Sequence, residues 1–311
     1  MLALGRLLRL SLSPSAAADA ACGVLLGANL WPAGGTAWLQ ILAALCVYHG
    51  GMALNDWADR RHDAATRPER PIPSGRISAG FALGLGLTLS LVGPLLSYVA
   101  APAAGWALAV VAFLSVSYNL GVRGPRIGPL LLGACRAGNL IAAFLCGRAS
   151  VVHDVAQDTV IEAWPLALAL AYGLYVFLLS CLARYEDTEA GPLPPTGSVR
   201  HPRSLLLYAA VVLALAPWLR TLDPDASLAW VVAAAGVALA GAFGLFQRVH
   251  SVVDWNPGAI LGSMGMGLRR LLIATGSFAV TQGRYEGLLV ALVILAGYPA
   301  SFALRKLFPP S

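Results

Sequence analysis

Charged residues are scarce in this chain, and that scarcity excludes most protein classes. Of 311 residues only 12% are charged, against about 25% in an average soluble domain. Hydrophobic residues make up 58%, and the mean hydropathy is +0.72. So little charge excludes a water-soluble domain, a disordered chain and a fibrous repeat. What remains is a polytopic α-helical membrane protein, because a segment in lipid must satisfy its own backbone hydrogen bonds.

Lysine and paired cysteines are also nearly absent. Lys306 is the only lysine among 21 basic residues, and none of the five cysteines forms a C-x-x-C pair. All five cysteines fall inside apolar runs, which is typical of reduced structural thiols rather than of a zinc site or a disulfide framework. In a soluble protein the net charge of +6 would suggest nucleic acid as a partner. Here the basic residues lie between apolar runs, so we expect them to set membrane topology, with no nucleic-acid partner.

Nine apolar stretches are long enough to span a membrane, since a span needs about 20 mostly apolar residues. They are 15–31, 37–58, 78–100, 103–121, 127–146, 163–183, 204–220, 227–248 and 286–305. A further stretch, 258–281, is interrupted by Arg269 and Arg270. We therefore predict an all-α membrane protein with nine or ten transmembrane helices in one polytopic domain, residues 1–311. Residues 1–14 are expected to form a short amphipathic lead-in at the membrane surface.

The placement of arginine predicts the orientation of these helices. Arginines gather at the N-terminus and in the loops after the second, fourth, sixth and eighth spans, whereas the alternate loops are uncharged or carry both signs. By the positive-inside rule, the N-terminus and the arginine-rich loops are cytoplasmic. Arg305 and Lys306 would join them if there are ten spans. The expected partners include the membrane lipids themselves.

The strongest functional signal follows the second span, in NDWADRRHDAATRPERPIPSG, residues 55–75. On a helix, Asn55, Asp59 and Asp63 are spaced four residues apart. Asp56 lies three residues before Asp59, so the four polar side chains share one face. Carboxylates stacked in this way repel each other unless a cation lies among them. Such oxygen ligands suit Mg²⁺, which keeps waters and takes further oxygens from a phosphorylated substrate.

Arginines follow these acids directly. Three prolines end the helix and stiffen a turn that holds Arg67, Arg70 and Arg76 near the acidic face. A guanidinium binds phosphate oxygens bidentately. Acids for Mg²⁺ beside arginines, at the end of a membrane helix, indicate a diphosphate site. The alternative is an ordinary loop whose aspartates and arginines pair with each other.

This segment resembles the signature of the UbiA-type intramembrane prenyltransferases. Their motif, N-D-x-x-D-x-x-x-D followed by R-P-x-R-P-x-P-S-G, is matched almost position for position by residues 55–75. The resemblance implies nine or so helices around a central cavity that opens to the cytoplasm and sideways to lipid. It also implies Mg²⁺-dependent transfer of an isoprenoid from a prenyl diphosphate to an acceptor, which the motif does not identify. It gives metal-binding and catalytic roles to Asn55, Asp56, Asp59 and Asp63, and substrate-binding roles to Arg67 and Arg70.

The second motif of the family, D-x-x-x-D, is altered in this sequence. Family members carry it after the sixth span, where this chain has ARYEDTEAG, residues 183–191. Asp187 falls at the second aspartate of the motif, but Ala183 falls at the first, and Glu186 could replace the lost carboxylate. We therefore predict metal-binding and catalytic roles for Glu186 and Asp187. The alternative is a helix end that pairs with Arg184. The divergence resembles the EboC-like branch of the superfamily.

Four further polar residues complete the predicted substrate site. Tyr118 ends the fourth span and Arg123 follows it, which resembles the tyrosine and basic pair that contact the diphosphate in the family. A plain positively charged loop is the alternative. Arg136 lies near the middle of the fifth span, with Asn139 one turn later on the same face. An intramembrane arginine costs at least ~2.5 kcal/mol on insertion scales, so Arg136 needs a diphosphate or a carboxylate partner. A structural ion pair is the alternative.

Two other functions stay open on the sequence alone. Because Ala183 weakens the second motif, the chain could be a non-catalytic or transport-related UbiA-like protein that binds a lipid diphosphate without turnover. A cation transporter with a carboxylate-lined path is the other possibility. Its acids would be expected at mid-span, however, and the arginine-rich turn would have no role. Quinone-ring, haem, chlorophyll, sugar and cyclitol acceptors are all compatible with the first motif.

Overall fold

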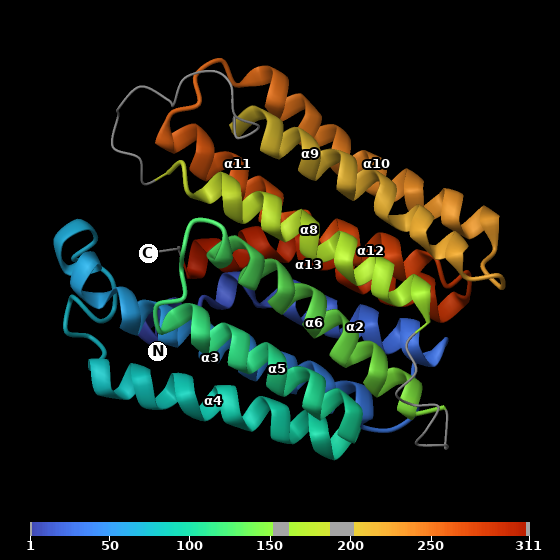
Figure 1. Ribbon diagram of the computed structural model, residues 1–311, viewed down its shortest axis with the longest axis horizontal. Coiled ribbons are helices and arrows are strands. Elements are labelled where there is room, and N and C mark those ends of the chain that lie inside the picture. Colours follow the sequence, from blue (N-terminus) through green and yellow to red (C-terminus); the bar gives the residue numbers. More distant parts are fainter. Residues whose placement is uncertain (1, 152–161, 187–201, 309–311) are drawn as a thin grey trace.

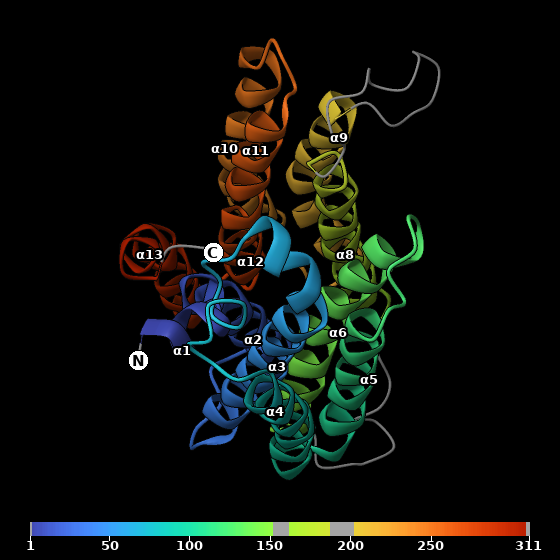
Figure 2. The ribbon, with the colours of Figure 1, turned by 90° about the vertical axis from the view of Figure 1, so that its left-hand side faces the viewer.

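The computed structural model describes residues 2–151, 162–186 and 202–308. These residues form helices and connecting turns, with no strand among them. Figure 1 shows the helices running side by side along the long axis, and Figure 2 shows the same bundle from its left-hand end. Nine helices in this part of the chain are long and apolar enough to cross a membrane. The prediction of an all-α, multi-pass membrane protein is confirmed.

The first half of the chain holds the lead-in and five long helices. The lead-in consists of α1 (Leu2–Leu7) and the 3-10 turn η1 (Leu10–Leu12). The long helices are α2 (Ser13–Ala28), α3 (Thr36–Thr66), α4 (Ala79–Ala100), α5 (Pro102–Asn119) and α6 (Ile127–Ala149). Most helix ends lie within a few residues of the predicted spans. The exception is α3, which continues about two turns beyond the end of the predicted membrane span.

The second half begins with α8 (Ala163–Ala183) and α9 (Pro202–Leu215), which η2 (Ala216–Leu222) continues. The helices that follow are α10 (Leu228–Ser251), α11 (Pro257–Arg269), α12 (Leu271–Val280) and α13 (Tyr285–Leu307). The interrupted tenth stretch thus forms two helices that meet at Arg270, and each is too short to count as a span by itself. A count of ten requires α11 and α12 to cross together as one broken segment.

Glycines bring α2 and α6 into close contact. Gly27 of α2 lies against the backbone oxygen of Phe144, and Gly147 of α6 lies against the backbone oxygen of Val24. A Cβ at either glycine would overlap the facing carbonyl. Small residues are typical of contacts between membrane helices, since lipid supplies little hydrophobic drive for helices to associate. This contact fixes the position of α2 relative to α6.

The largest core cluster lies deep in the bundle, among α2, α6, α8, α9, α10 and α12. Tyr172, Tyr175 and Phe278 are its largest fully buried side chains. Conversely, α4 and α13 are the least buried of the nine candidate spans. On the neighbouring helix α5, large apolar side chains such as Trp106 and Phe113 are also mostly exposed, as expected for helix faces that contact lipid rather than water.

The length of α3 places the acidic motif. Its 31 residues extend roughly 46 Å at 1.5 Å per residue, whereas the hydrocarbon core of a bilayer is about 30 Å thick. The final turns of α3 therefore extend past the hydrocarbon core. Figure 1 shows this end of α3 at the left of the bundle, near α1 and the final turns of α13. The acidic motif lies in these final turns.

Candidate functional site

The predicted acidic row lies on α3, and each of its aspartates forms an ion pair with an arginine. The pairs are Asp56–Arg9 at 3.3 Å, Asp59–Arg123, and Asp63–Arg70 at 2.7 Å. The three arginines come from the lead-in, from the segment after α5, and from the turn after α3. The alternative of simple pairing within the loop therefore describes only Asp63 and Arg70. The other two pairs join distant parts of the chain.

Arg9 is a site residue that the sequence analysis missed. Its guanidinium donates to Asn55 Oδ1 at 3.1 Å and to Asp56 Oδ1 at 3.3 Å. The backbone of Arg9 has φ 49° and ψ 50°, in the left-handed region that few residues other than glycine adopt. The lead-in therefore bends at Arg9, which brings the side chain onto the acidic row.

His49 holds the two sides of this bend. Its Nδ1 hydrogen-bonds to the backbone oxygen of Leu8 at 2.8 Å, and its Nε2 hydrogen-bonds to Ser13 Oγ at 3.2 Å. Leu7 is fully buried in a small core with Ala53 of α3 and with Ala82. The lead-in is thus packed into the bundle as well as lying at its surface. Leu7 and His49 dock the lead-in onto α3, and its position at the membrane surface stays a prediction.

Asn119 joins the same end of the row, at Asn55, to the segment after α5. Its Oδ1 accepts hydrogen bonds from Asn55 Nδ2 at 3.4 Å and from Arg123 Nη2 at 3.2 Å. The predicted partners Tyr118 and Arg123 are also in contact, since the Arg123 Nε donates to the backbone oxygen of Tyr118 at 3.0 Å. The Arg123 guanidinium lies 5.0 Å from the centre of the Tyr118 ring. Tyr118 and Asn119 together orient Arg123 toward Asp59.

Asp63 and Arg70 form the least accessible of the three ion pairs on the acidic row. Both residues are buried, with 1% and 6% of their surfaces exposed. Their ion pair attaches the proline-rich turn to the end of α3. The turn is closed further by Ser74, whose Oγ donates to the Arg70 backbone oxygen at 2.7 Å. Gly75 has φ 73°, which suits a residue without a side chain.

The two motif segments meet at Arg67 and Glu186. The Arg67 Nη2 lies 3.4 Å from Glu186 Oε1, and both side chains are partly exposed. Glu186 lies just after α8, whose last residue is Ala183. Asp187, the other predicted acid of the second motif, lies outside the described residues. The contact brings Glu186 beside the first motif although the two segments are 119 residues apart in sequence.

Arg136 and Asn139 belong to a second, buried cluster around Asp19 of α2. Arg136 donates to Asp19 Oδ2 at 2.7 Å and to Ser15 Oγ at 3.1 Å. Asn139 Nδ2 lies 3.5 Å from the same carboxylate oxygen, and the Tyr172 hydroxyl donates to Asp19 Oδ1 at 2.5 Å. We expected Arg136 to need either a diphosphate or a carboxylate as its partner, and Asp19 supplies the carboxylate. Asp19 is fully buried.

The Asp19 cluster borders the same helix that carries the acidic row. The Arg136 guanidinium lies 5.4 Å from the centre of the Tyr48 ring. Tyr48 is two turns before Asp56 on α3, next to the His49 that holds the lead-in. Asn139 Oδ1 is buried and has no hydrogen-bond partner. The cluster therefore keeps one acceptor atom for a hydrogen-bond donor that the protein does not supply.

The donor set of the acidic row fits a magnesium ion that is shared with a substrate. Within the described residues, no three His, Cys, Asp or Glu side chains converge closely enough to hold a metal by themselves. Mg²⁺ commonly takes only one or two carboxylates and completes its shell with water and substrate phosphates. Asp56 Oδ2 is buried without a partner, beside Asn55 and one turn from Asp59. Oxygen donors of this kind are the ones Mg²⁺ prefers.

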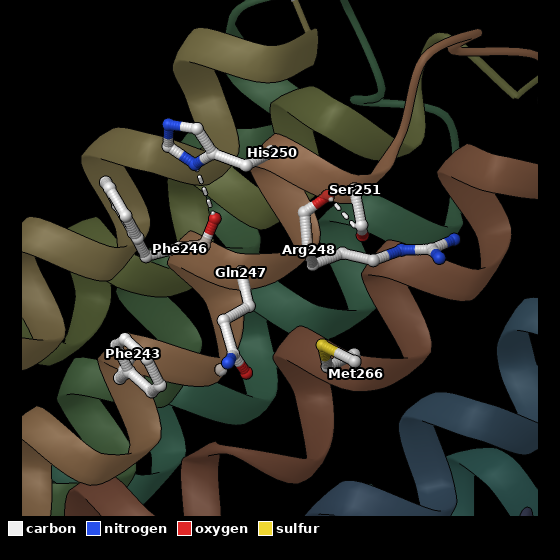
Figure 3. A pocket seen from close by; sticks show the side chains of 8 residues that line it. Phe243, Phe246, Gln247, Arg248, His250, Ser251 and Met266 are labelled. Carbon is white, nitrogen blue, oxygen red and sulfur yellow. Dashed lines mark hydrogen bonds between the residues drawn. The ribbon is translucent and has the colours of Figure 1, made fainter.

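A separate groove of about 800 Å³ lies at the end of α10, facing Met266 of α11. Figure 3 shows Phe243, Phe246 and His250 on one side of it, with Arg248 and Met266 on the other. Of the predicted site residues that the structure describes, none lines this groove. It is therefore distinct from the acidic row.

Comparison with known proteins places these features in a family. A digeranylgeranylglyceryl phosphate synthase of Ignicoccus hospitalis is 32% identical over 208 residues, which are 62% of this chain and 65% of that protein. A 4-hydroxybenzoate octaprenyltransferase of Cupriavidus necator is 27% identical, over 70% of this chain and 79% of that protein. This chain spans less than two thirds of the length of the first curated relatives that it matches.

A solved structure supports the same fold. A UbiA homolog from Archaeoglobus fulgidus, bound to GPP and Mg²⁺, matches with a TM-score of 0.60 and 16% identity, over 90% of this chain and 99% of that one. At this identity the likeness concerns the fold alone. The model of the UbiA prenyltransferase family matches residues 16–264, from α2 into α11. Since that match covers most of the sequence, the chain belongs to the UbiA prenyltransferase family.

Proposed function

We propose that this chain transfers a prenyl group from a prenyl diphosphate to an acceptor within the membrane, with Mg²⁺ as cofactor. Relatives with this family's sequence are named as prenyltransferases, and the Archaeoglobus homolog binds GPP and Mg²⁺. One observation carries the proposal for this chain. The oxygen donors Asn55, Asp56 and Asp59 lie beside the guanidiniums of Arg9 and Arg123, at the end of a helix that extends past the hydrocarbon core.

In this proposal Asn55, Asp56 and Asp59 hold the metal. When bound, Mg²⁺ offsets the negative charge of the diphosphate and so improves it as a leaving group. Asp63, Glu186 and Asp187 complete the proposed set of acids. Asp63 acts from a buried ion pair with Arg70, and Glu186 acts from its contact with Arg67.

The arginines of the same pairs are proposed to bind the phosphate oxygens. Arg9, Arg67 and Arg123 each lie against a carboxylate. A diphosphate that arrives with its metal therefore finds both charge signs already in place, with guanidiniums for its oxygens and carboxylates for the cation. Because the site offers paired charges, binding exchanges partners and leaves no large uncompensated charge behind. Tyr118 orients Arg123, and Arg70 holds the turn.

Arg136 and Asn139 are proposed to contact the substrate from the deeper cluster. The unpartnered Asn139 Oδ1 is buried, so it gains a hydrogen bond if a ligand presents a donor. The charge of Arg136 is neutralised by Asp19, so Arg136 would contribute a hydrogen bond to the substrate and little net charge. The acceptor is not identified, since the relatives named above act on different acceptors.

The chemistry follows from these contacts. The allylic C–O bond breaks, and its electron pair leaves with the diphosphate oxygen, whose charge Arg9, Arg67 and Arg123 stabilise. A nucleophilic carbon or oxygen of the acceptor forms the new bond to the allylic carbon and releases its proton to water or a base. Apolar helices around the prenyl chain exclude the water that would compete with the acceptor.

The orientation is also part of the proposal. The arginine pattern favours a cytoplasmic position for the lead-in, for the turn after α3 and for the segment after α8. The end of α13 lies near the same end of the bundle (Figure 1), which fits ten crossings with α11 and α12 as one broken segment. The single-domain organisation and membership of the EboC-like branch stay predictions.

Release of diphosphate by the purified protein tests the function. In detergent with Mg²⁺, a labelled polyprenyl diphosphate and a panel of quinone-ring, haem, chlorophyll, sugar and cyclitol acceptors, we expect release that requires the metal and an acceptor. It should fall at least ~100-fold in Asp59→Ala, because that variant loses a proposed Mg²⁺ ligand and with it the charge stabilisation of the leaving group. The exposed Asp254 between α10 and α11 is the matched control, and Asp254→Asn should retain release.

The same assay separates the rival functions. Binding of the diphosphate without release would favour a non-catalytic lipid-diphosphate binder, the reading that Ala183 at the end of α8 supports. Ion flux in liposomes that is insensitive to Arg67→Ala would favour a transporter. Mass spectrometry of the products formed with candidate acceptors would then identify the acceptor.

A further inference from the structure

Four arginines at the end of α10, at the break between α11 and α12 and at the end of α13 have no acidic partner among the described residues. They are Arg248, Arg269, Arg270 and Arg305, and no salt bridge among the described residues includes any of them. Within or next to a membrane an uncompensated guanidinium is costly. Positive charge of this kind, with no described carboxylate within salt-bridge distance, favours binding of an anion from outside the protein.

Arg270 is the most buried of the four, with 8% of its surface exposed. Its Nε donates to the backbone oxygen of Gly241 at 2.8 Å, and its Nη1 donates to that of Met266 at 3.2 Å. Its Nη2 lies against Gly244, where a Cβ would overlap it. These contacts supply carbonyl oxygens but no negative charge, so the cation is solvated by backbone dipoles and not neutralised.

The groove described above lies over this arginine. Gly244 and Met266, which Arg270 contacts, both line the groove. Its volume is about 800 Å³ and it is open at the surface of the bundle. Phe243 and Phe246 form its apolar side and are 58% and 45% exposed. The groove therefore combines an apolar wall with a buried guanidinium behind its lining, since Arg270 contacts lining residues but does not itself line the groove.

The rim of the groove carries Arg248 and His250 (Figure 3). Arg248 Nε donates to Ser263 Oγ at 3.1 Å, which bridges α10 to α11. His250 Nδ1 bonds to the backbone oxygen of Phe246 at 2.9 Å, and its ring packs on the Phe246 ring at 4.1 Å. Because Nδ1 donates to that carbonyl, Nε2 is the remaining ring atom, and it donates to an anion when the ring is protonated.

More positive charge lies on the opposite side of α11. The guanidiniums of Arg269 and Arg305 both lie within 4 Å of the position that a Cβ on Gly265 would occupy. Arg269 also stacks on the Phe302 ring at 4.6 Å, and its Nε is buried without a hydrogen-bond partner. Two like charges gathered around one glycine strengthen the positive potential that an anion near α11 would meet.

We infer that this groove binds the phosphate headgroup of an anionic phospholipid, with Arg248 and His250 at the phosphate, Arg270 beneath it, and an acyl chain along Phe243 and Phe246. A lipid fits because the groove opens on the outer surface of α10, and a wall of exposed phenylalanine suits an acyl chain. The described residues that line the groove include no acid, so they offer no carboxylate for a metal-bound diphosphate. The inference does not depend on the proposed transferase activity.

Thermal unfolding of the delipidated protein in detergent tests it. With EDTA and without prenyl diphosphate, phosphatidylglycerol should raise the melting temperature, whereas phosphatidylcholine with the same acyl chains should have little effect. Arg248→Gln should weaken the apparent affinity for phosphatidylglycerol about 5-fold, the effect of one basic residue at an anionic lipid surface. Arg61→Gln, which removes an exposed charge from α3, is the matched control and should leave it unchanged.

Three outcomes would overturn the inference. They are equal stabilisation by the two lipids, unchanged affinity in Arg248→Gln, and equal stabilisation by inorganic pyrophosphate, which would assign the groove to a free anion. If Arg248→Gln fails to fold, His250→Gln changes an exposed side chain and should show the same selective loss. Because metal and substrate are absent, a negative result here leaves the transferase proposal untouched, and a failed transferase assay leaves this one untouched.

Discussion

Arginine has opposite surroundings at the end of α3 and at the junctions of α10 to α13. Around α3 and α6, Arg9, Arg67, Arg70, Arg123 and Arg136 each contact a carboxylate. At the α10–α13 junctions, the guanidiniums of Arg248 and Arg270 contact backbone oxygens or a hydroxyl, and Arg269 contacts an aromatic ring. The first arrangement can exchange its internal partners for a metal and its diphosphate. In the second arrangement the guanidiniums have no carboxylate partner to release, so an added anion would neutralise them. That arrangement suits a stably bound anion.

The largest loss of stability is expected when a buried arginine loses the acid with which it pairs. Asp19→Ala leaves Arg136 buried without a counter-charge, and breaking a buried pair in this way costs about 3–5 kcal/mol. We expect a large fall in the melting temperature in detergent. Arg270→Met is the matched change in the unpaired region. It leaves no carboxylate behind, so it should change the melting temperature far less.

A double variant sharpens this test. Replacing both Asp19 and Arg136 with leucine removes the two charges together and should recover part of the lost stability, because no buried charge remains. Equal losses from Asp19→Ala and Arg270→Met would remove the distinction between the two regions. So would a double variant less stable than the single one.

A smaller effect is expected at Arg9, where the comparison concerns ligand binding and not stability. Arg9→Gln removes a charged donor from Asn55 and Asp56, and a hydrogen bond to a charged group contributes about 1.5–3 kcal/mol. The dissociation constant for a prenyl diphosphate with Mg²⁺ should therefore rise roughly 10-fold or more, measured by equilibrium binding without acceptor. Arg6→Gln, on the same lead-in, should bind normally. Unchanged binding in Arg9→Gln would remove Arg9 from the phosphate site.

The smallest effect is expected at the pair that joins the two motifs. Arg67 and Glu186 are 3.4 Å apart and partly exposed, and pairs of this kind contribute about 0–1 kcal/mol to stability. A double-mutant cycle with Arg67→Gln and Glu186→Gln should therefore show little coupling in the melting temperature, although both variants impair diphosphate release. Strong coupling in stability would instead make the contact a structural clamp.

Most of the fold was predictable because apolar runs of membrane length have few alternatives. The runs 78–100, 127–146 and 163–183 became α4, α6 and α8 with small shifts at their ends. The predicted span stopped at residue 58 because the last turns of α3 are charged, and hydropathy alone ends a span where polarity begins. The helix itself was expected to continue through the acids and to end at the prolines, and it ends at Thr66. The helix continues there because Asp56, Asp59 and Asp63 lie on one face and find partners in other segments.

Residue spacing indicated only the part of the site that is close in sequence, and Tyr118, Arg123 and Glu186 were predicted from the family resemblance. The row from Asn55 to Asp63 follows from helical spacing, but Arg9 and Asn119 reach it from 46 and 64 residues away. No local pattern indicates such contacts. One signal was available for Asp19. It is a lone acid in the first apolar run, and a lone arginine, Arg136, lies in the fifth. Opposite charges isolated in two spans are expected to pair, since each is costly alone.

The overhang of α3 has a consequence for the fate of the products. In the proposed reaction, because α3 extends about two to three turns past the hydrocarbon, the pyrophosphate that departs is already at the edge of the aqueous phase, whereas the prenylated product is still anchored among apolar helices. Partitioning then separates the two products by itself. The hydrophilic fragment drifts into solution, the greasy one diffuses away in the leaflet, and their reunion becomes improbable.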